Sequence, residues 1–348
     1  MSDMPYWCKS AYFFIVEFNS RGMICLGIES TAHTFGAGIV TEKGKILANC
    51  KAAYVTDKGG IHPSLAREHH ESVKDKIVQD ALQHAKMRME DIGLISFSQG
   101  PGLAPCLLVG FKKAIALARE NKKPIIGVNH CVAHLEIGKL LTKAKDPVLL
   151  YASGANTQII ALDGGKYRIF GETLDQGIGN FIDSFARHLG LGFPGGPKIE
   201  QLAKNRKEYV EIPYVVKGMD VSFSGMLTNL KRKHDSKQYS KEDLSFSLQE
   251  TAFAMLVEVS ERAMAHCEKK ELLLGGGVGC NSRLQEMCRI MCKERYAKFY
   301  VSERQFLVDN GAMIAWQGIL QKAKATAKYS SLDILPYQRT DDVIVDWH

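Results

Sequence analysis

The sequence predicts an α/β protein built from two related lobes. Residues 24–54 and 148–171 each contain an apolar strand, a short polar turn, a second strand, a glycine-containing turn and a third strand. Each copy leads into helical periodicity, and strands then alternate with helices, as in an α/β sheet. A length of 348 residues also favours two domains. We expect an N-terminal lobe over residues 23–147 and a C-terminal lobe over residues 148–348, whose last segment can pack back on the first lobe.

Apolar periodicity and chain-breaking residues place the other elements. In the N-terminal half they predict helices over 63–89 and 107–119 and strands over 94–98 and 124–128. In the C-terminal half they predict a strand over 271–274 and helices over 178–189, 198–204, 244–267, 283–292 and 311–324. The charge-dense residues 231–243 are expected to form a solvated loop, in preference to a contact with tRNA or phosphate.

The composition excludes several classes of protein. Hydrophobic residues make up 45% and charged residues 24%, which are ordinary values for a globular chain and argue against global disorder, collagen and disulfide miniproteins. No apolar run approaches the ~20 residues of a membrane-spanning helix. The 45 Lys and Arg exceed the 38 Asp and Glu by 7, which permits a nucleic-acid partner without requiring one. The nine cysteines contain no C-x-x-C pair, so we expect reduced thiols in an intracellular protein.

Residues 1–22 are set apart from the rest of the chain. Their apolar run is short and is interrupted by Glu17, and no small-residue cleavage site follows, so a secretory signal is not indicated. We expect an N-terminal extension that need not be ordered, with the domain beginning at Met23. A buried extra strand is the alternative.

Three glycine-rich turns follow predicted strands, at residues 153–157, 194–197 and 275–279. Glycine lets the backbone approach a ligand closely, and free N–H groups at a turn bind phosphate. None of the three turns is a P-loop or a dinucleotide-binding fingerprint. Together they favour a nucleotide between the lobes, with purely structural turns as the competing explanation.

His130 and His134 are four residues apart, so on a helix both imidazoles would face one metal ion. Two ligands rarely hold a metal, and without others two ordinary histidines are the better explanation. Cys131 stands where a zinc protease would have its glutamate, which disfavours proteolysis. Asp309 precedes a predicted helix, and taken alone it is best explained as a helix cap.

Seven segments, taken in order, resemble one known family. They are SQGPG (98–102), GVNHCVAHLEIGKL (127–140), LYASGANTQ (150–158), FPGGPKIE (193–200), MDVSFSG (219–225), LGGGVGCNSRL (274–284) and DNGAMIAW (309–316). The chain from Met23 onward resembles the tRNA N6-adenosine threonylcarbamoyltransferase family, which includes bacterial TsaD and the catalytic subunit of the archaeal and eukaryotic KEOPS complex. Tyr151 and the tail QRTDDVIVDW (338–347) resemble the archaeal and eukaryotic branch.

The resemblance implies the actin-like ATPase (ASKHA) fold, with two RNase-H-like lobes around a central cleft. It implies transfer of a threonylcarbamoyl group from threonylcarbamoyl-AMP to N6 of the adenosine beside the anticodon, in tRNAs that decode codons beginning with A. It also implies a kinase-like subunit and a small dimerising subunit as partners. The implied location is the cytoplasm, with the nucleus as a second compartment, and no membrane is involved.

The resemblance also assigns residues. Carried over position by position, four residues would hold one divalent cation, iron or zinc: His130, His134, Tyr151 and Asp309. Those that would bind the adenylate are Tyr151, Ala152, Ser153, Gly154, Ala155, Asp183, Gly196, Glu200 and Asn281. This ligand set reverses the capping interpretation of Asp309. No residue is assigned as the base that deprotonates the adenosine amine.

The chain departs from the family pattern at a few positions. Ala155 replaces a glycine, which would cost roughly 1–2 kcal/mol if that position needs a positive φ. Gly279 and Cys280 replace alanines. Glu29 stands where many fold relatives carry an aspartate for magnesium-ATP, which argues against direct ATP hydrolysis.

Three alternative functions follow from the same residues. A sugar or acetate kinase of the same fold would leave the paired histidines without a purpose. A metalloprotease is disfavoured by Cys131, and the intact set of four ligands argues against a scaffold that has lost catalysis.

Overall fold

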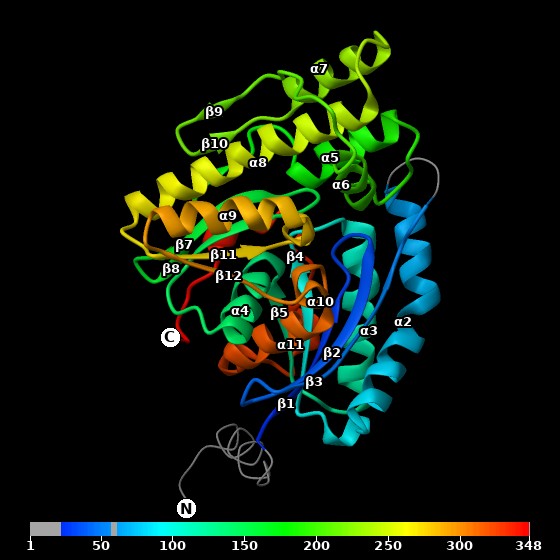
Figure 1. The fold of residues 1–348 in the computed structure, drawn as a ribbon. Helices are drawn as coiled ribbons and strands as arrows, with labels where there is room; N and C mark the ends of the chain where they lie inside the picture. Colours follow the sequence, from blue (N-terminus) through cyan, green and yellow to red (C-terminus); the bar gives the residue numbers. More distant parts are fainter. Residues whose placement is uncertain (1–21, 57–60, 348) are drawn as a thin grey trace, which may run out of the picture.

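The protein is described here by a computed structural model of residues 22–56 and 61–347, and its described part contains two mixed sheets of five strands (Figure 1). The first sheet has the spatial order β3-β2-β1-β4-β5. Its strands are β1 (Ile24–Glu29), β2 (Thr34–Thr41), β3 (Ile46–Ala53), β4 (Leu94–Gly100) and β5 (Ile125–Asn129). The first three strands pair antiparallel, whereas β4 is parallel to both β1 and β5.

The second sheet repeats this arrangement. Its order is β12-β11-β6-β7-β8, with antiparallel pairing from β6 to β8 and parallel pairing from β6 through β11 to β12. Its strands are β6 (Val148–Ala152), β7 (Thr157–Asp163), β8 (Lys166–Glu172), β11 (Glu271–Gly275) and β12 (Lys298–Val301). When the strands of each sheet are numbered 1 to 5 in chain order, both sheets have the same spatial order, 3-2-1-4-5. The internal repeat predicted from the sequence is therefore confirmed.

Helices cover both faces of the first sheet. The helices α2 (Pro63–Ala85) and α3 (Ala104–Glu120) pack on one face, while α4 (His130–Thr142) and α11 (Gly311–Leu320) lie on the other. Alternation along β1 separates the two cores, because Leu26 and Ile28 face α2 and α3 whereas Cys25 faces α11.

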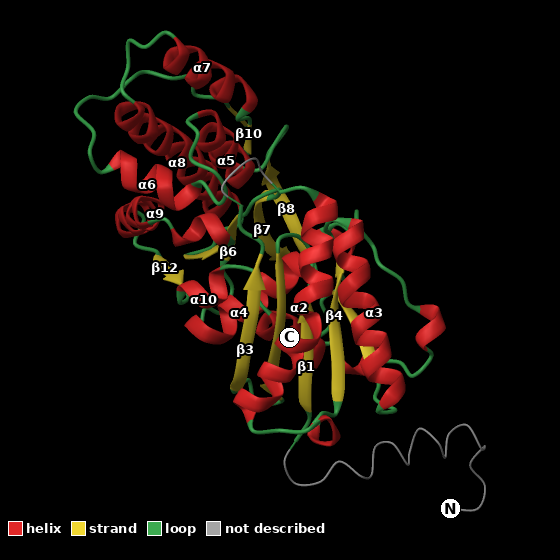
Figure 2. Cartoon of the chain, turned by 90° about the vertical axis from the view of Figure 1, so that its right-hand side faces the viewer, coloured by secondary structure: helices red, strands yellow, loops and turns green. Residues whose placement is uncertain are grey.

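Five helices of the second half gather at the end of the molecule away from α2 and α3 (Figure 2). They are α5 (Ile178–His188), α6 (Gly196–Ala203), α7 (Ser224–Asp235), α8 (Lys241–His266) and α9 (Ser282–Glu294). The short α10 (Arg304–Leu307) lies beside α4. A two-stranded hairpin joins β9 (Val216–Lys217) to β10 (Asp220–Val221). Single 3₁₀ turns lie at Met89–Asp91, Gly277–Cys280, Lys322–Lys324, Tyr329–Ser331 and Thr340–Asp342.

The helix α4 is shared by the two sheets. Its first nine residues are all buried. Ala133 and Ile137 pack into the core of the first sheet, and Val132 and Leu135 pack against Leu149 in the core of the second. A side chain on α4 can therefore meet groups from both halves of the chain.

The helix α11 approaches the first sheet so closely that two strand glycines are required. A Cβ atom at Gly27 would lie 2.2 Å from the amide nitrogen of Ala315, and one at Gly38 would lie 2.2 Å from that of Ala312. Both distances are far inside van der Waals contact. Gly27 and Gly38 therefore allow the backbone of α11 to lie directly against β1 and β2.

The segment that follows α11 contacts both sheets. Leu335 donates its amide to the carbonyl of Gln99, and Asn129 donates its side-chain amide to the carbonyl of Arg339. Farther on, Val345 donates to Gly165 in the turn between β7 and β8. The lobe boundary expected after residue 147 falls between α4 and β6 and stays a prediction.

Three sequence predictions need correction or fall outside the described residues. The charge-dense residues 231–243 are only partly a loop, because α7 continues to Asp235 and residues 236–240 connect it to α8. The helix α8 begins at Lys241, where Ser240 caps it by accepting the amide of Asp243. The first long helix ends at Ala85, because Lys86 takes a left-handed conformation with φ of 54°. The extension over residues 1–22 lies outside the described residues except for its last one.

The remaining predicted elements are confirmed to within a few residues, although the helix expected over 311–324 ends at Leu320. None of the described helices is both long enough and apolar enough to cross a membrane.

Candidate active site

The helix α4 places two imidazoles on one side. Asn129 caps the helix, since its side-chain oxygen accepts the amide of Val132, and His130 is therefore the first helical residue. His134 follows one turn later, and the two ring centroids are 4.8 Å apart. The helical spacing predicted for the histidine pair is confirmed.

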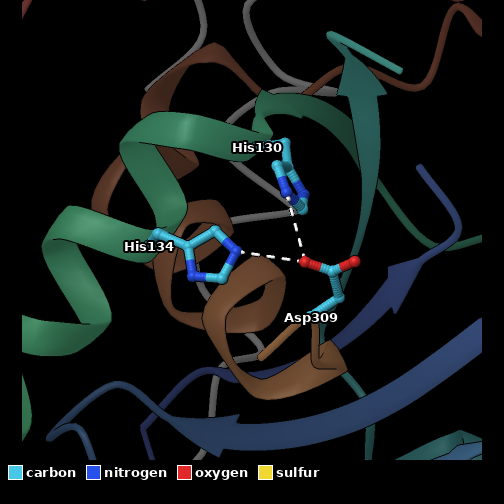
Figure 3. A group of neighbouring side chains, drawn as sticks. All are labelled: His130, His134 and Asp309. Carbon is cyan, nitrogen blue, oxygen red and sulfur yellow. Dashed lines mark hydrogen bonds and ion pairs between the residues drawn. The ribbon is translucent and has the colours of Figure 1, made fainter. Parts of the chain in front are cut away.

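Asp309 faces both histidines from the segment before α11. Its Oδ1 atom lies 3.5 Å from Nε2 of His130 and 3.3 Å from Nε2 of His134 (Figure 3). The cap of α11 is the next residue, Asn310, whose side-chain oxygen accepts the amide of Met313 at 3.0 Å. The capping role that the sequence pattern favoured for Asp309 is wrong, because the adjacent asparagine fills it.

Glu29 holds the other nitrogen of His130. Its Oε2 atom lies 3.0 Å from Nδ1 of His130, and both side chains are buried. The second oxygen of Glu29 accepts the amide of Thr31 at 2.6 Å and also its hydroxyl. Sequence reasoning missed this role, although an acidic residue that ends an entirely apolar strand was the available signal.

The buried charges of this group influence one another. Burial disfavours the charged form of His130, but the carboxylates of Glu29 and Asp309 outweigh it and raise its pKa to about 9. Burial and the neighbouring His130 lower the pKa of His134. Burial alone would raise the pKa of Asp309, yet the hydrogen bond with His134 and the charge of His130 hold it well below its usual range.

Tyr151 reaches the same group from the second sheet. It lies in β6, is 1% exposed, and its ring centroid is 5.1 Å from that of His134. Burial, together with the nearby Cys131 and Asp309, raises the pKa of the phenol well above its ordinary value. Of the four residues assigned to a cation, three form one cluster and the fourth packs against it.

The cluster fits a transition-metal site. The ligand atoms of His130, His134 and Asp309 all lie within 4.8 Å of one another. Imidazole nitrogens with a carboxylate oxygen are a donor set that suits zinc or iron. In such sites the remaining ring N–H of a ligating histidine is commonly held by an outer carboxylate, which is the position of Glu29 relative to His130.

The turn after β6 presents free amides. Within the described chain, the backbone N–H groups of Gly154 and Ala155 donate to no acceptor, and both residues are exposed. Ala155 is not among the residues with positive φ, so the alanine carries no strain at this position. Gly276 packs against the start of this turn with φ of 87°, where a Cβ would lie 2.4 Å from the carbonyl oxygen of Ala152.

The acids assigned to the adenylate lie on neighbouring helices. Asp183 on α5 accepts the amide of Gly195 at 2.7 Å, and burial raises the pKa of its carboxyl group. Glu200 on α6 uses one oxygen to accept the amide and hydroxyl of Ser282. A Cβ at Gly196 would meet no atom within 4 Å.

The side chain of Asn281 makes hydrogen bonds within the protein. Its side-chain oxygen caps α9 by accepting the amides of Arg283 and Leu284, and its Nδ2 atom donates to Gln249 at 2.6 Å. Both polar atoms of this buried side chain are therefore engaged within the protein.

Comparison with known proteins supplies the deciding observation. The family model of the tRNA N6-adenosine threonylcarbamoyltransferase TsaD matches residues 45–316. A relative of that name from Thermococcus kodakarensis is 56% identical, over 93% of this chain and 100% of its own length. A "probable bifunctional tRNA threonylcarbamoyladenosine biosynthesis protein" from Methanothermobacter thermautotrophicus is 51% identical, over 93% of this chain and 61% of its own.

The chain belongs to the tRNA N6-adenosine threonylcarbamoyltransferase family.

Solved structures support the fold expected for this transferase family. HypF from Thermococcus kodakarensis aligns with a TM-score of 0.61 and 14% identity, over 89% of this chain and 49% of that one. Component A of (R)-2-hydroxyglutaryl-CoA dehydratase from Acidaminococcus fermentans aligns with a TM-score of 0.56 and 13% identity, over 87% and 100%. These likenesses concern the fold alone. They confirm the actin-like ATPase architecture with two RNase-H-like lobes.

Membership in the transferase family decides between the candidate functions. The activity is transfer of a threonylcarbamoyl group to N6 of an adenosine in tRNA, rather than phosphoryl transfer or proteolysis. Burial raises the pKa of the Cys131 thiol to about 12, so this residue is not a reactive substitute for a protease glutamate.

Proposed function

We propose that the threonylcarbamoyl donor is threonylcarbamoyl-AMP and that the acceptor is the adenosine beside the anticodon of tRNAs that decode ANN codons. We propose further that the chain acts as the catalytic subunit of a KEOPS complex, with a kinase-like subunit and a small dimerising subunit. Its location would be the cytoplasm, with the nucleus as a second compartment. The observation that carries the proposal is the buried group of His130, His134 and Asp309 beside Tyr151.

His130, His134, Asp309 and Tyr151 would hold one divalent cation, iron or zinc. When bound, such a cation supplies a fixed positive charge that polarises and holds donor oxygen atoms. The protein's own contribution is orientation: Glu29 keeps Nδ1 of His130 occupied, so that Nε2 is directed toward Asp309.

The adenylate would lie along the turn after β6. The free amides of Gly154 and Ala155 suit phosphate oxygens, because backbone N–H groups in a turn bind anions. Asp183 and Glu200 would accept ribose hydroxyls, and Gly196 leaves room for the nucleotide. Because its polar atoms are already engaged, Asn281 would act by holding the start of α9 in place.

The protein itself contributes little covalent chemistry to the transfer. The lone pair of N6 attacks the carbamoyl carbon, the bond from that carbon to the phosphate oxygen breaks, and AMP leaves with the electron pair. The N6 proton passes to solvent or to the departing phosphate, since no base is assigned. With a good leaving group, positioning and charge stabilisation supply most of the rate.

The test combines the purified chain, its partner subunits, threonylcarbamoyl-AMP and unmodified tRNA. We expect modified tRNA from the wild type and a loss of bound metal and activity in a His130→Ala/His134→Ala variant. His84→Ala, at an exposed position on α2, is the matched control. Full activity of the double variant would exclude the metal assignment, and a wild type inactive with its partners would favour a scaffold.

A further inference from the structure

A second group of metal-type ligands lies outside the active site. His188 is in the last turn of α5, and His234 and Asp235 are in the last turn of α7. His188 and His234 are 46 residues apart in the chain. Neither α5 nor α7 contributes a residue to the cluster of His130, His134 and Asp309. Figure 1 shows α7 at the far end of the second lobe from α11.

The three side chains converge on one point. Oδ1 of Asp235 lies 2.7 Å from Nε2 of His188 and 3.4 Å from Nδ1 of His234. The two imidazole rings are edge to face, with centroids 5.3 Å apart. All three ligand atoms lie within 4.8 Å of one another.

One of these atoms is buried and poorly satisfied. Nδ1 of His234 is inaccessible to solvent and has no hydrogen-bond partner of good geometry among the described residues. Its separation from Asp235, 3.4 Å, is longer than a well-formed N–H···O bond. A buried nitrogen within 4.8 Å of a carboxylate oxygen and of a second imidazole nitrogen is an unexplained polar atom that a cation would satisfy.

The dimensions suit a small transition-metal ion. In a tetrahedral zinc site with ligand bonds of about 2.0–2.1 Å, neighbouring ligand atoms are about 3.3 Å apart. The separations from Asp235, 2.7 and 3.4 Å, bracket that value. The Asp235 side chain is 61% exposed, which leaves access for the ion and for a water ligand.

The helix ends and the neighbouring basic residues act in opposite directions on a bound cation. Both helices end here, and the negative end of a helix dipole favours a cation. Arg187 precedes His188, and Arg232 and Lys233 lie in the last turn of α7. The ammonium group of Lys233 lies over the ring of Tyr239, 4.8 Å from the centroid.

We propose that His188, His234 and Asp235 form a second divalent-cation site, of the zinc class, completed by water. A bound ion would join the ends of α5 and α7. Because α5 also carries Asp183 and begins against the turn after β6, this link would brace the helix that borders the proposed adenylate site.

The experiment measures zinc bound to the full-length chain after chelation, dialysis against zinc and removal of free metal. In a His130→Ala/His134→Ala background, which lacks the active-site ligands, we expect one equivalent of zinc. Adding His188→Gln with His234→Gln should abolish it, whereas the exposed control pair His62→Gln with His84→Gln should leave it in place.

The wild-type chain provides an independent measurement that does not depend on that background folding. There, His188→Gln with His234→Gln should lower the zinc content by one equivalent and leave the active-site metal in place. An unchanged zinc content in both backgrounds, or an equal loss with the control pair, would overturn the proposal. Neither outcome depends on the identity of the threonylcarbamoyl donor.

Discussion

Glu29 and His130 form a buried pair whose side-chain atoms, Oε2 and Nδ1, are 3.0 Å apart. The pair joins the end of the first strand to the start of α4, which are 101 residues apart in the chain. It fixes which imidazole nitrogen is available to Asp309, because the other nitrogen is already occupied. Glu29 is thus a positioning residue for the candidate metal centre.

Glu29→Gln should weaken metal binding without removing a ligand. Loss of the outer carboxylate typically lowers metal affinity about 10–100-fold, and we expect a decrease of that size here. The measurement is a competition titration with a chelator. Glu90→Gln, at an exposed position, is the control and should leave the metal affinity unchanged. An affinity equal to that of the wild type would show that Glu29 does not position His130.

Asn310 and Asp309 are neighbours with separable roles. Asn310→Ala should lower the free energy of unfolding by about 1–2 kcal/mol, because it removes a helix cap. Asp309→Asn keeps that cap and should instead lower the metal content and the rate of tRNA modification. Thermal unfolding and metal analysis of both variants distinguish the roles, and the opposite pattern would restore Asp309 as the cap.

A methyl group added at Gly38 should disrupt the packing of α11 against the first sheet. Gly38→Ala places a Cβ 2.2 Å from a backbone nitrogen, so we expect a loss of at least about 1–3 kcal/mol of stability. Metal binding should weaken as well, since Asp309 lies directly before α11. Gly225→Ala is the matched control, because a Cβ there meets nothing within 4 Å. Equal melting temperatures for the two variants would contradict this packing.

His70 should make the protein sensitive to acid. Burial, with the neighbouring His69 and His33, lowers the pKa of His70 from 6.5 to about 4. Between these values the unfolded chain binds a proton that the folded chain does not, so the unfolding free energy falls as pH decreases, by up to about 3 kcal/mol.

The matching measurement is the pH dependence of denaturant unfolding between pH 6.5 and 4. His70→Leu should flatten it, whereas the exposed control His84→Leu should not. A slope that is the same in all three proteins would mean that other groups cause the acid sensitivity.

Much of the fold could be predicted because its signals are local. The strand triplets at residues 24–54 and 148–171 contain their own turns, and pairing of adjacent strands needs no distant information. The histidine pair was visible for the same reason, since i and i+4 residues share a helix face. The role of α11 was not visible, because Gly27 and Gly38 are 288 and 274 residues away from Ala315 and Ala312, the α11 residues that they contact.

The errors arose where one residue type serves two purposes. An acid before a helix suits capping as well as ligation, and only the neighbouring Asn310 shows which applies to Asp309. Charges such as those of residues 231–243 occur in loops and also on exposed helix ends, and the cap at Ser240 decides between the two. The role of Glu29 was not visible in the sequence, because its partner His130 is known only from the tertiary structure.

The position of α11 in the chain has a consequence for synthesis. A ribosome completes the five strands of the first sheet by residue 129, yet α11, one of the two helices on one face of that sheet, emerges only at residues 311–320. Until then the apolar face with Cys25 and Val40 lacks part of its cover, and a nascent chain has both histidines without the aspartate. We therefore expect truncated or slowly translated chains to need chaperones, and to acquire metal only after nearly the whole chain has emerged.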